Sequence, residues 1–148
     1  MELRRVRLGD PLVAPLLSGL HDEYHRRYGP NEEMSRTDED EFDPPSGLFV
    51  VLLDGGETAG GGGFRFHRPG ECEVKRMWVD PERRRQGLAV RVLDALEREA
   101  ISAGYHRLVL ETGPRQPEAV ALYEGRGYAR IPRYGHYPDA LAFALDLV

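Results

Sequence analysis

A helix with one continuous apolar stripe, at residues 87–103, constrains the fold more than any other feature of this sequence. Its apolar residues recur every four positions, and charged residues lie between them. These apolar residues are Leu88, Val92, Leu96 and Ala100. Strand-like runs precede the helix at residues 71–79 and follow it at residues 107–111. Strand, helix and strand in this order predict a parallel crossover within one sheet.

The remaining segments predict antiparallel strands around this unit. The apolar run 48–53 is followed by the turn signal Asp54-Gly55-Gly56 and then by a partner strand at 58–66. Further strands are expected at 3–8, 128–132 and 141–148, with helices at 11–27 and 117–126. The expected fold class is therefore α+β: a mixed, mostly antiparallel sheet of about seven strands with flanking helices. The length of 148 residues fits a single domain, 1–148.

Two local features work against these assignments. Four consecutive glycines, at 60–63, lie within the expected strand 58–66. Glycine weakens a strand unless a bulge or a close approach of another backbone requires it. Pro15 and Gly19 likewise weaken the prediction of a continuous helix at 11–27.

The bulk composition limits the functional class. Net charge is −5 and the pI about 5.6, which argues against a nucleic-acid partner. No apolar run approaches the ~20 residues of a membrane span, and no signal peptide follows Met1, so we expect a cytoplasmic protein with no membrane partner. The single Cys72 cannot form an intrachain disulfide. No metal site is expected, because the pair His21 and His25 lacks a third ligand.

The start of the helix at Gly87 has the features of an anion site. No Ser, Thr, Asp or Asn stands immediately before it to cap the first amides. A pyrophosphate could accept hydrogen bonds from those amides, and glycine presents no side chain to block it. Arg84 and Arg85 would add cationic donors at the rim. A solvated basic turn before a glycine-started helix is the simpler alternative.

A family resemblance favours the anion site. The pattern Arg84-x-x-Gly87-x-Ala89 resembles the Q/R-x-x-G-x-G/A cofactor loop of the GNAT superfamily of N-acetyltransferases. The resemblance extends to Leu108-Val109-Leu110-Glu111-Thr112 and to Ala121-Leu122-Tyr123-x-x-x-Gly127-Tyr128, and covers roughly residues 47–131. It implies the GNAT-like acyl-CoA N-acyltransferase fold, with acetyl-CoA as the acyl donor.

The resemblance also assigns residues to the cofactor. Backbone groups of the strand before the loop would bind the pantetheine arm, the loop and the helix start would bind the pyrophosphate, and one side-chain amide would add a contact. The implied residues are Met77, Trp78, Val79, Arg84, Arg85, Gln86, Gly87, Leu88, Ala89, Val90 and Gln116.

Three residues are candidates for the chemistry. Tyr123 stands where related enzymes place a tyrosine that protonates or orients the coenzyme A sulfur, although it also fits the apolar face of its helix. Glu111 matches the general base of some relatives, and Glu73 on the preceding strand is its rival. The implied reaction is direct attack of a primary amine on acetyl-CoA in a ternary complex. A non-catalytic acyl-CoA sensor or accessory module is the alternative.

The amine acceptor lies outside these motifs, and a small molecule and a peptide both remain open. Two segments are candidates for binding it: the acidic residues 31–43 and the aromatic stretch Tyr134-Gly135-His136-Tyr137. Negative charge near the acceptor would attract a cationic amine. A homodimer is compatible with the resemblance.

Overall fold

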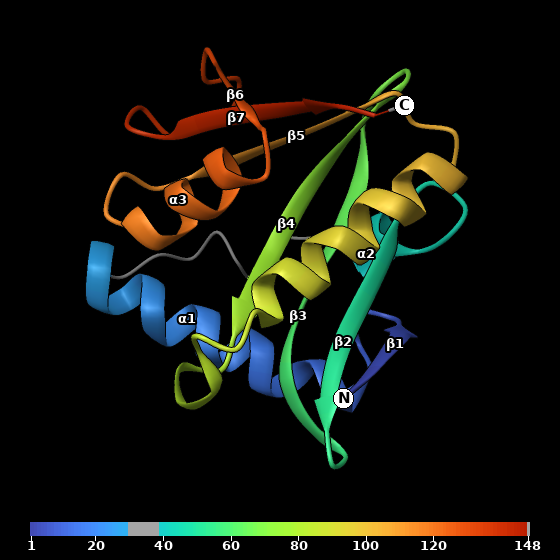
Figure 1. Ribbon diagram of the computed structural model, residues 1–148, viewed down its shortest axis with the longest axis vertical. Helices are drawn as coiled ribbons and strands as arrows, with labels where there is room; N and C mark the ends of the chain where they lie inside the picture. The colour runs from blue at the N-terminus through green and yellow to red at the C-terminus, as the bar shows by residue number, and fades with distance from the viewer. Residues whose placement is uncertain (30–38, 148) are drawn as a thin grey trace.

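The computed structural model describes residues 1–29 and 39–147, in which a single seven-stranded sheet carries three helices (Figure 1). The strands are β1 (Glu2–Val6), β2 (Leu48–Asp54), β3 (Glu57–Arg68), β4 (Glu71–Val79), β5 (Arg107–Thr112), β6 (Ala129–Ile131) and β7 (Leu141–Asp146). The α-helices are α1 (Ala14–Tyr28), α2 (Leu88–Ser102) and α3 (Pro117–Gly125). Short 3-10 turns lie at η1 (Pro11–Val13), η3 (Glu39–Phe42) and η4 (Pro81–Arg83).

The sheet has the order β1-β2-β3-β4-β5-β7-β6. Only the β4–β5 pair is parallel, and α2 makes the crossover between these strands. The predicted mixed, mostly antiparallel α+β sheet of about seven strands is therefore confirmed.

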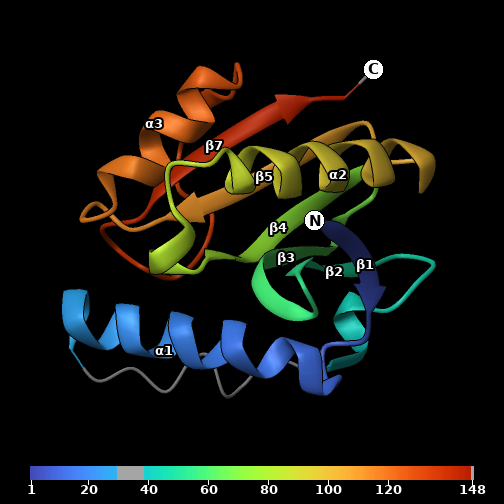
Figure 2. The same ribbon diagram turned by 60° about the horizontal axis from the view of Figure 1, so that its bottom comes forward.

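The helices cover both faces of the sheet, so the structure has three layers (Figure 2). On one face α2 and α3 pack over a core that includes Val92, Leu96 and Phe143. On the other face α1 packs over a smaller core that includes Leu16, Leu20 and Trp78. The apolar stripe of α2 is buried as its four-residue spacing predicts.

The residues that weakened the prediction of α1 are accommodated at specific positions. Asp10 caps η1, and its Oδ1 accepts a hydrogen bond from the Leu12 amide at 2.8 Å. Pro15 lies in the first turn of α1, where an amide has no partner within the helix. Gly19 lies against the indole of Trp78, and a Cβ at this position would collide with the ring. The helix therefore runs without interruption and presses closely on β4.

The glycine run in β3 reflects crowding on both faces of the sheet. A Cβ on Gly60 would lie 2.9 Å from the Trp78 carbonyl oxygen, and one on Gly62 would lie 2.8 Å from the Met77 sulfur. A Cβ on Gly63 would meet Phe49 and the Leu48 carbonyl at 2.5 and 2.7 Å. The close approach that glycine permits in a strand is thus what this segment needs.

The acidic stretch 31–43 lies largely outside the described residues, and only η3 and its neighbours can be assessed. Within the described part of the chain, no helix is long and apolar enough to cross a membrane.

Candidate active site

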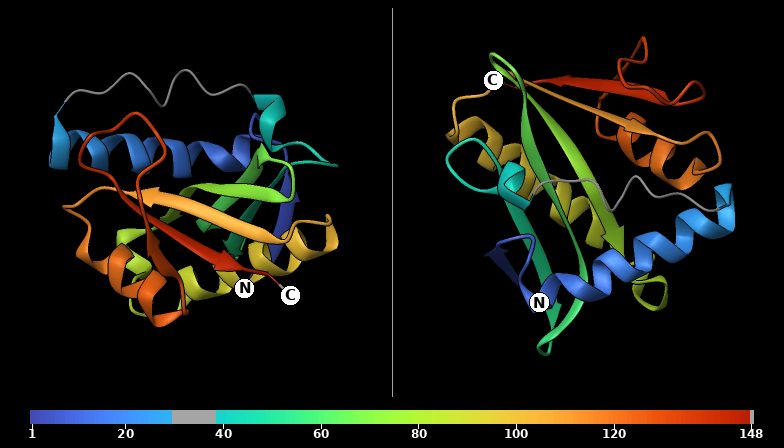
Figure 3. Two further views of the ribbon diagram at one scale, coloured as in Figure 1. Left: turned by 90° about the horizontal axis from the view of Figure 1, so that it is seen from above. Right: turned by 180° about the vertical axis from the view of Figure 1, so that it is seen from behind.

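Strands β4 and β5 pair for only three residues and then separate. The paired positions are Glu71 with Arg107, Cys72 with Leu108, and Glu73 with Val109. Beyond them β5 continues beside β7, while β4 continues beside β3 (Figures 1 and 3). A cleft of about 1090 Å³ occupies the region where they separate, and α1, α3 and the start of α2 also line it. Strands β4 and β5 therefore form a splayed pair that opens into the cleft.

The start of α2 faces this cleft with its amides uncapped. Gly87 adopts the left-handed conformation, with φ 74° and ψ 18°, and no side chain caps the helix. A Cβ on Gly87 would meet no described atom within 4 Å, so the space beside it is open to a ligand. Leu88, Ala89 and Val90 follow it in the cleft lining. These features give an anion access to the free amides and to the positive end of the helix dipole.

Arg84 and Arg85, which the sequence predicts as cationic donors at the rim of the anion site, have different surroundings in the structure. Arg84 donates a hydrogen bond to Glu23 Oε1 of α1 at 3.1 Å, so its charge is already matched. Arg85 lines the cleft with φ 66°, a left-handed conformation that is uncommon for a non-glycine residue. Gln86 lies beside the cleft, outside its lining. Arg83 pairs with Asp54, Glu57 and Asp80, which accounts for part of the basic run.

The end of β4 offers its backbone to the cleft. The side chains of Met77 and Val79 pack against the core under α2, and that of Trp78 packs under α1. All three residues line the cleft. A ligand between the strands would therefore meet the strand backbone, as expected for a pantetheine arm.

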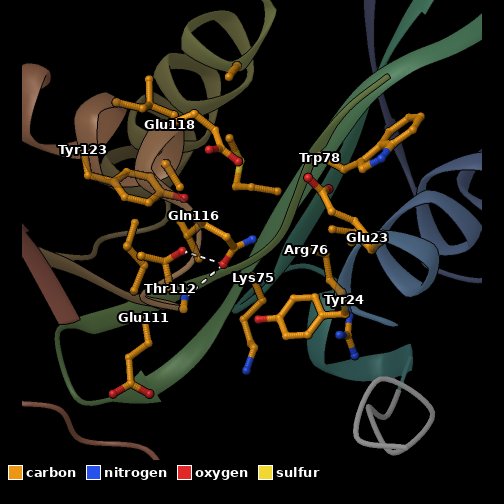
Figure 4. Close-up of a pocket in the computed structure, with 18 of the residues that line it drawn as sticks. Glu23, Tyr24, Lys75, Arg76, Trp78, Glu111, Thr112, Gln116, Glu118 and Tyr123 are labelled. Atoms are coloured by element: carbon orange, nitrogen blue, oxygen red, sulfur yellow. Dashed lines mark hydrogen bonds between the residues drawn. The ribbon is translucent and has the colours of Figure 1, made fainter. Parts of the chain in front are cut away.

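Gln116 positions the turn between β5 and α3. Its Oε1 accepts hydrogen bonds from Thr112 Oγ1 at 2.9 Å and from the Gly113 amide at 3.0 Å (Figure 4). The side-chain nitrogen is the part of Gln116 that can contact a ligand. Gln116 thus has a structural role in addition to the cofactor contact expected for it.

Tyr123 is buried at the inner wall of the cleft, and its hydroxyl points into the cavity (Figure 4). Its ring packs against Tyr128 and Phe143. Burial, with a smaller contribution from Tyr24, raises the pKa of Tyr123 well above the usual value of 10. Tyr123 therefore belongs to the core, as the apolar face of its helix predicts, and it also brings a protonated phenol to the cleft. Its role toward a coenzyme A sulfur stays a prediction.

The two candidate bases have different partners. Glu73 is buried, and its Oε1 accepts from Arg65 Nε at 3.1 Å while its Oε2 accepts from the Tyr134 hydroxyl at 2.8 Å. Both oxygens of Glu73 are thus engaged. Glu111 accepts from the amides of Tyr134 and Gly135, at 3.0 and 3.2 Å, and both bonds go to Oε2. The remaining oxygen of Glu111 is the more available acceptor.

Sequence reasoning missed the contribution of the end of α1. Arg27 Nη1 donates to the Arg115 carbonyl at 2.7 Å, Arg115 Nη1 donates to the Arg27 carbonyl at 3.0 Å, and Tyr28 Oη accepts from the Arg115 amide at 3.1 Å. Arg27 also pairs with Glu118 of α3 at 2.7 Å. Figure 3 shows the end of α1 beside the loop between β5 and α3, so these contacts join two segments that line the cleft. No local pattern joins residues that are 88 positions apart.

Comparison with known proteins identifies the family. The model of the acetyltransferase (GNAT) family matches residues 16–128. The chain belongs to this family. An IAA acetyltransferase of Azospirillum brasilense is 36% identical over 104 residues, which cover 69% of this chain and 68% of that protein. YjgM of Escherichia coli K12, an uncharacterised N-acetyltransferase, is 30% identical over 137 residues, covering 87% and 82% of the two chains. The GNAT chain is accordingly an acetyltransferase.

Solved structures show the same fold. A Brucella melitensis ribosomal-protein-alanine N-acetyltransferase superposes with a TM-score of 0.76 at 18% identity, covering 99% of this chain and 100% of that one. An aminoglycoside 6'-N-acetyltransferase complexed with coenzyme A gives a TM-score of 0.71 at 18% identity, covering 100% and 98%. The GNAT-like acyl-CoA N-acyltransferase fold is therefore confirmed.

Proposed function

We propose that this GNAT protein transfers the acetyl group of acetyl-CoA to a primary amine of a small molecule or peptide. The observation that carries the proposal is the cleft that joins the uncapped start of α2 to the hydroxyl of Tyr123. At one end of this cleft, the free amides of α2 suit a phosphate. At the other end, the protonated hydroxyl of Tyr123 can act as an acid. Within the described residues, no cluster of three or more metal-binding side chains is found.

The residues present fit acetyl-CoA. The free amides at Leu88 to Val90 and the left-handed Gly87 would hold the pyrophosphate, and Arg85 lies beside them. The backbone of residues 77–79 would pair with the pantetheine arm, with Gln116 on the facing wall. Arg84 acts through Glu23, which fixes the loop to α1. Bound there, acetyl-CoA would supply a thioester as the acyl donor.

Side chains of this protein would then donate and accept the protons of the reaction. The raised pKa of Tyr123 keeps its phenol protonated at neutral pH, so it can donate to the sulfur that leaves. Glu111 is the better placed of the two bases, because Glu73 is already bound to Arg65 and Tyr134. Glu111 would accept the proton of the acceptor amine through a water molecule. The amine would attack directly, with no acyl-enzyme: burial raises the pKa of Cys72 to about 12, which leaves its thiol unreactive.

A turnover assay tests this proposal and separates it from a non-catalytic acyl-CoA sensor. The protein is incubated with acetyl-CoA and a broad amine library, and free thiol is followed. We expect acetylation of at least one amine, and a fall in kcat of roughly 100-fold or more in Tyr123→Phe. Tyr105→Phe is the matched control, because it also loses a buried phenol, one that donates to the Ser46 carbonyl away from the cleft. Binding of acetyl-CoA without acetylation of any amine would favour the sensor.

A further inference from the structure

The loop between β6 and β7, residues 132–140, folds back over the sheet toward the two candidate bases. In the sheet order β4-β5-β7-β6 this loop leaves the edge strand, and it lies on the face of the sheet that α1 covers (Figures 2 and 3). The amide of Tyr134 donates to Glu111 Oε2 on β5 at 3.0 Å, and its hydroxyl donates to Glu73 Oε2 on β4 at 2.8 Å. One residue of the loop therefore binds both glutamates.

The ring of Tyr134 is held at its hydroxyl and at its face. Its partner Glu73 is itself fixed, since Oε1 of Glu73 accepts from Arg65 Nε at 3.1 Å and the side chain is only 7% exposed. The ring of His67 packs on that of Tyr134, with 4.8 Å between the centroids. Burial, followed by the charge of Glu73, raises the pKa of Tyr134 well above the usual value of 10, so its hydroxyl remains a donor at neutral pH. The side chain of Tyr134 thus anchors the loop to β3 and β4.

The backbone of the same loop fixes the carboxylate of Glu111. The amides of Tyr134 and Gly135 both donate to Oε2, at 3.0 and 3.2 Å, so Oε1 is the oxygen that can face a reactant. Oε1 lies close to Gly135, where a Cβ would collide with it. Gly135 does not have the left-handed backbone that favours glycine, so space for the carboxylate is what glycine provides here.

Tyr134 and Gly135 are placed to act on the reaction through these contacts. The two glutamates line the cleft, whereas Tyr134 and Gly135 are not among its lining residues. The sequence predicts the whole aromatic stretch 134–137 as a candidate for binding the acceptor. Its first two residues contact the glutamates instead, and Tyr137 is the residue of this stretch that lines the cleft.

We propose that Tyr134 and Gly135 are positioning residues for the general base Glu111. Tyr134, anchored through its hydroxyl on Glu73, places two amides on Oε2 of Glu111, and Gly135 leaves room for Oε1 to face the water that takes the proton of the amine. This proposal rests on the function proposed above, and it makes Glu73 the anchor of the loop rather than a second base. Misplacing a catalytic group by about 1 Å can lower a rate about 100-fold, so fixing the base is worth a dedicated contact.

Amide hydrogen exchange tests the anchor without any substrate. Tyr134→Phe removes the hydroxyl and keeps the ring and the amide. We expect the amides of residues 134 and 135 to exchange about tenfold faster in this variant, because the loop then opens more often. Tyr105→Phe is the matched control: its hydroxyl donates to the Ser46 carbonyl at 2.7 Å, and its loss should leave exchange in the loop unchanged. Unchanged exchange in Tyr134→Phe would overturn the anchor.

Steady-state kinetics test the positioning. In Tyr134→Phe we expect kcat to fall about tenfold with an unchanged KM for acetyl-CoA, because a less ordered base slows proton transfer and the residues proposed for the cofactor are untouched. Gly135→Ala should lower kcat in the same way, since its methyl group displaces Oε1 of Glu111. Gly125→Ala is the control: a Cβ there meets no described atom within 4 Å, and kcat should not change.

A double-mutant cycle separates positioning from a general structural role. Glu111→Gln has no base to position, so adding Tyr134→Phe to it should lower kcat further by less than about twofold. An equal fall in both backgrounds would show that Tyr134 acts independently of Glu111, and a raised KM for acetyl-CoA would show that the whole cleft is disturbed. Either result would overturn the proposal and leave the acetyltransferase function intact. If protein that binds acetyl-CoA acetylates no amine, the proposed function fails and the positioning role fails with it.

Discussion

The cleft has two halves that are built in different ways. The half that we propose for the cofactor (the cofactor half) comprises residues 84–90 and the backbone of residues 77–79, and it offers mainly amides and one left-handed glycine. The half that we propose for the acceptor (the acceptor half) comprises the end of α1, Glu73, Glu111 and residues 134–140, and it offers side chains held by ion pairs and hydrogen bonds.

Because of this difference, we expect the two halves to respond differently to substitutions. An anion site made of helix amides needs only the helix start and an unobstructed approach. A site made of paired side chains depends on every partner, because removing one leaves another charge unmatched. A substitution in the cofactor half should therefore weaken binding by changing the backbone at one position. A substitution in the acceptor half should instead disturb several side chains that are linked by ion pairs and hydrogen bonds.

The largest expected effect comes from a side chain that blocks the approach of an anion to the free amides in the cofactor half. Gly87→Val places a β-branched residue at φ 74°, beside the free amides of α2. We expect the affinity for acetyl-CoA, measured by calorimetry, to fall about 100-fold, or ~2.7 kcal/mol, since one or two charge-assisted bonds are lost.

Gly104→Val is the matched control for Gly87→Val. Gly104 follows the other end of α2 with φ 93°, and a Cβ there also meets no described atom within 4 Å. The two variants share the strain of a left-handed valine, and only one lies at the expected phosphate site. Equal affinities in the two variants would show that the pyrophosphate is bound elsewhere.

The next effect separates the two glutamates of the acceptor half. Glu111→Gln keeps an amide oxygen that can accept from Tyr134 and Gly135, so the loop stays in place while the basic group is lost. We expect kcat to fall about 100-fold with little change in the melting temperature. Glu73→Gln leaves Arg65 with a weakened partner and should lower stability more than kcat. The reverse pattern in the two variants would make Glu73 the base.

The same two halves show what a sequence can predict. Gly87, the missing cap and the stripe of α2 are local signals, and the structure places them as expected. The bridge from Glu23 to Arg84 joins residues 61 positions apart, and the bond between Tyr134 and Glu73 spans the same separation. Pairings of this kind depend on the tertiary fold, so they leave no pattern in the sequence.

Strand β4 contains a bulge, where Arg76 and Met77 together oppose Gly62, and the sequence did not predict it for a different reason. Left-handed backbone is usually signalled by glycine or asparagine, and here an arginine adopts it. The spacing of the apolar residues in β4 is nevertheless consistent with the bulge, because Val74 and Met77 are three positions apart yet lie on one face. Strict alternation would have separated them.

Glu23 links the two halves, and its removal should have an intermediate effect. Its Oε1 binds Arg84 of the cofactor loop at 3.1 Å and Arg27 of α1 at 3.2 Å. In Glu23→Gln we expect about fivefold weaker acetyl-CoA binding and a loss of ~1–3 kcal/mol in the free energy of unfolding. Asp22→Asn, an exposed neighbour on the same helix, is the control and should change neither value. Unchanged acetyl-CoA binding in Glu23→Gln would mean that the halves are independent.

The smallest expected effect lies at Glu71. This residue belongs to neither half, because it lies where β4 and β5 still pair. Burial alone would raise the pKa of Glu71, but hydrogen bonds from Arg68 and His67, together with their charges, outweigh burial and lower it below its ordinary 4.5. A carboxyl with a lowered pKa in the folded state contributes stability above its unfolded pKa and loses it as the pH falls through the folded value.

Wild-type protein should therefore lose more free energy of unfolding than Glu71→Gln as the pH is lowered from about 6 to 3. Urea unfolding at several pH values measures this difference. Since Glu71 touches neither half of the cleft, kcat and both KM values at neutral pH should be unchanged in folded Glu71→Gln. An altered KM for acetyl-CoA would mean that the closed end of the strand pair controls how far β4 and β5 separate, and the two halves would then share one hinge.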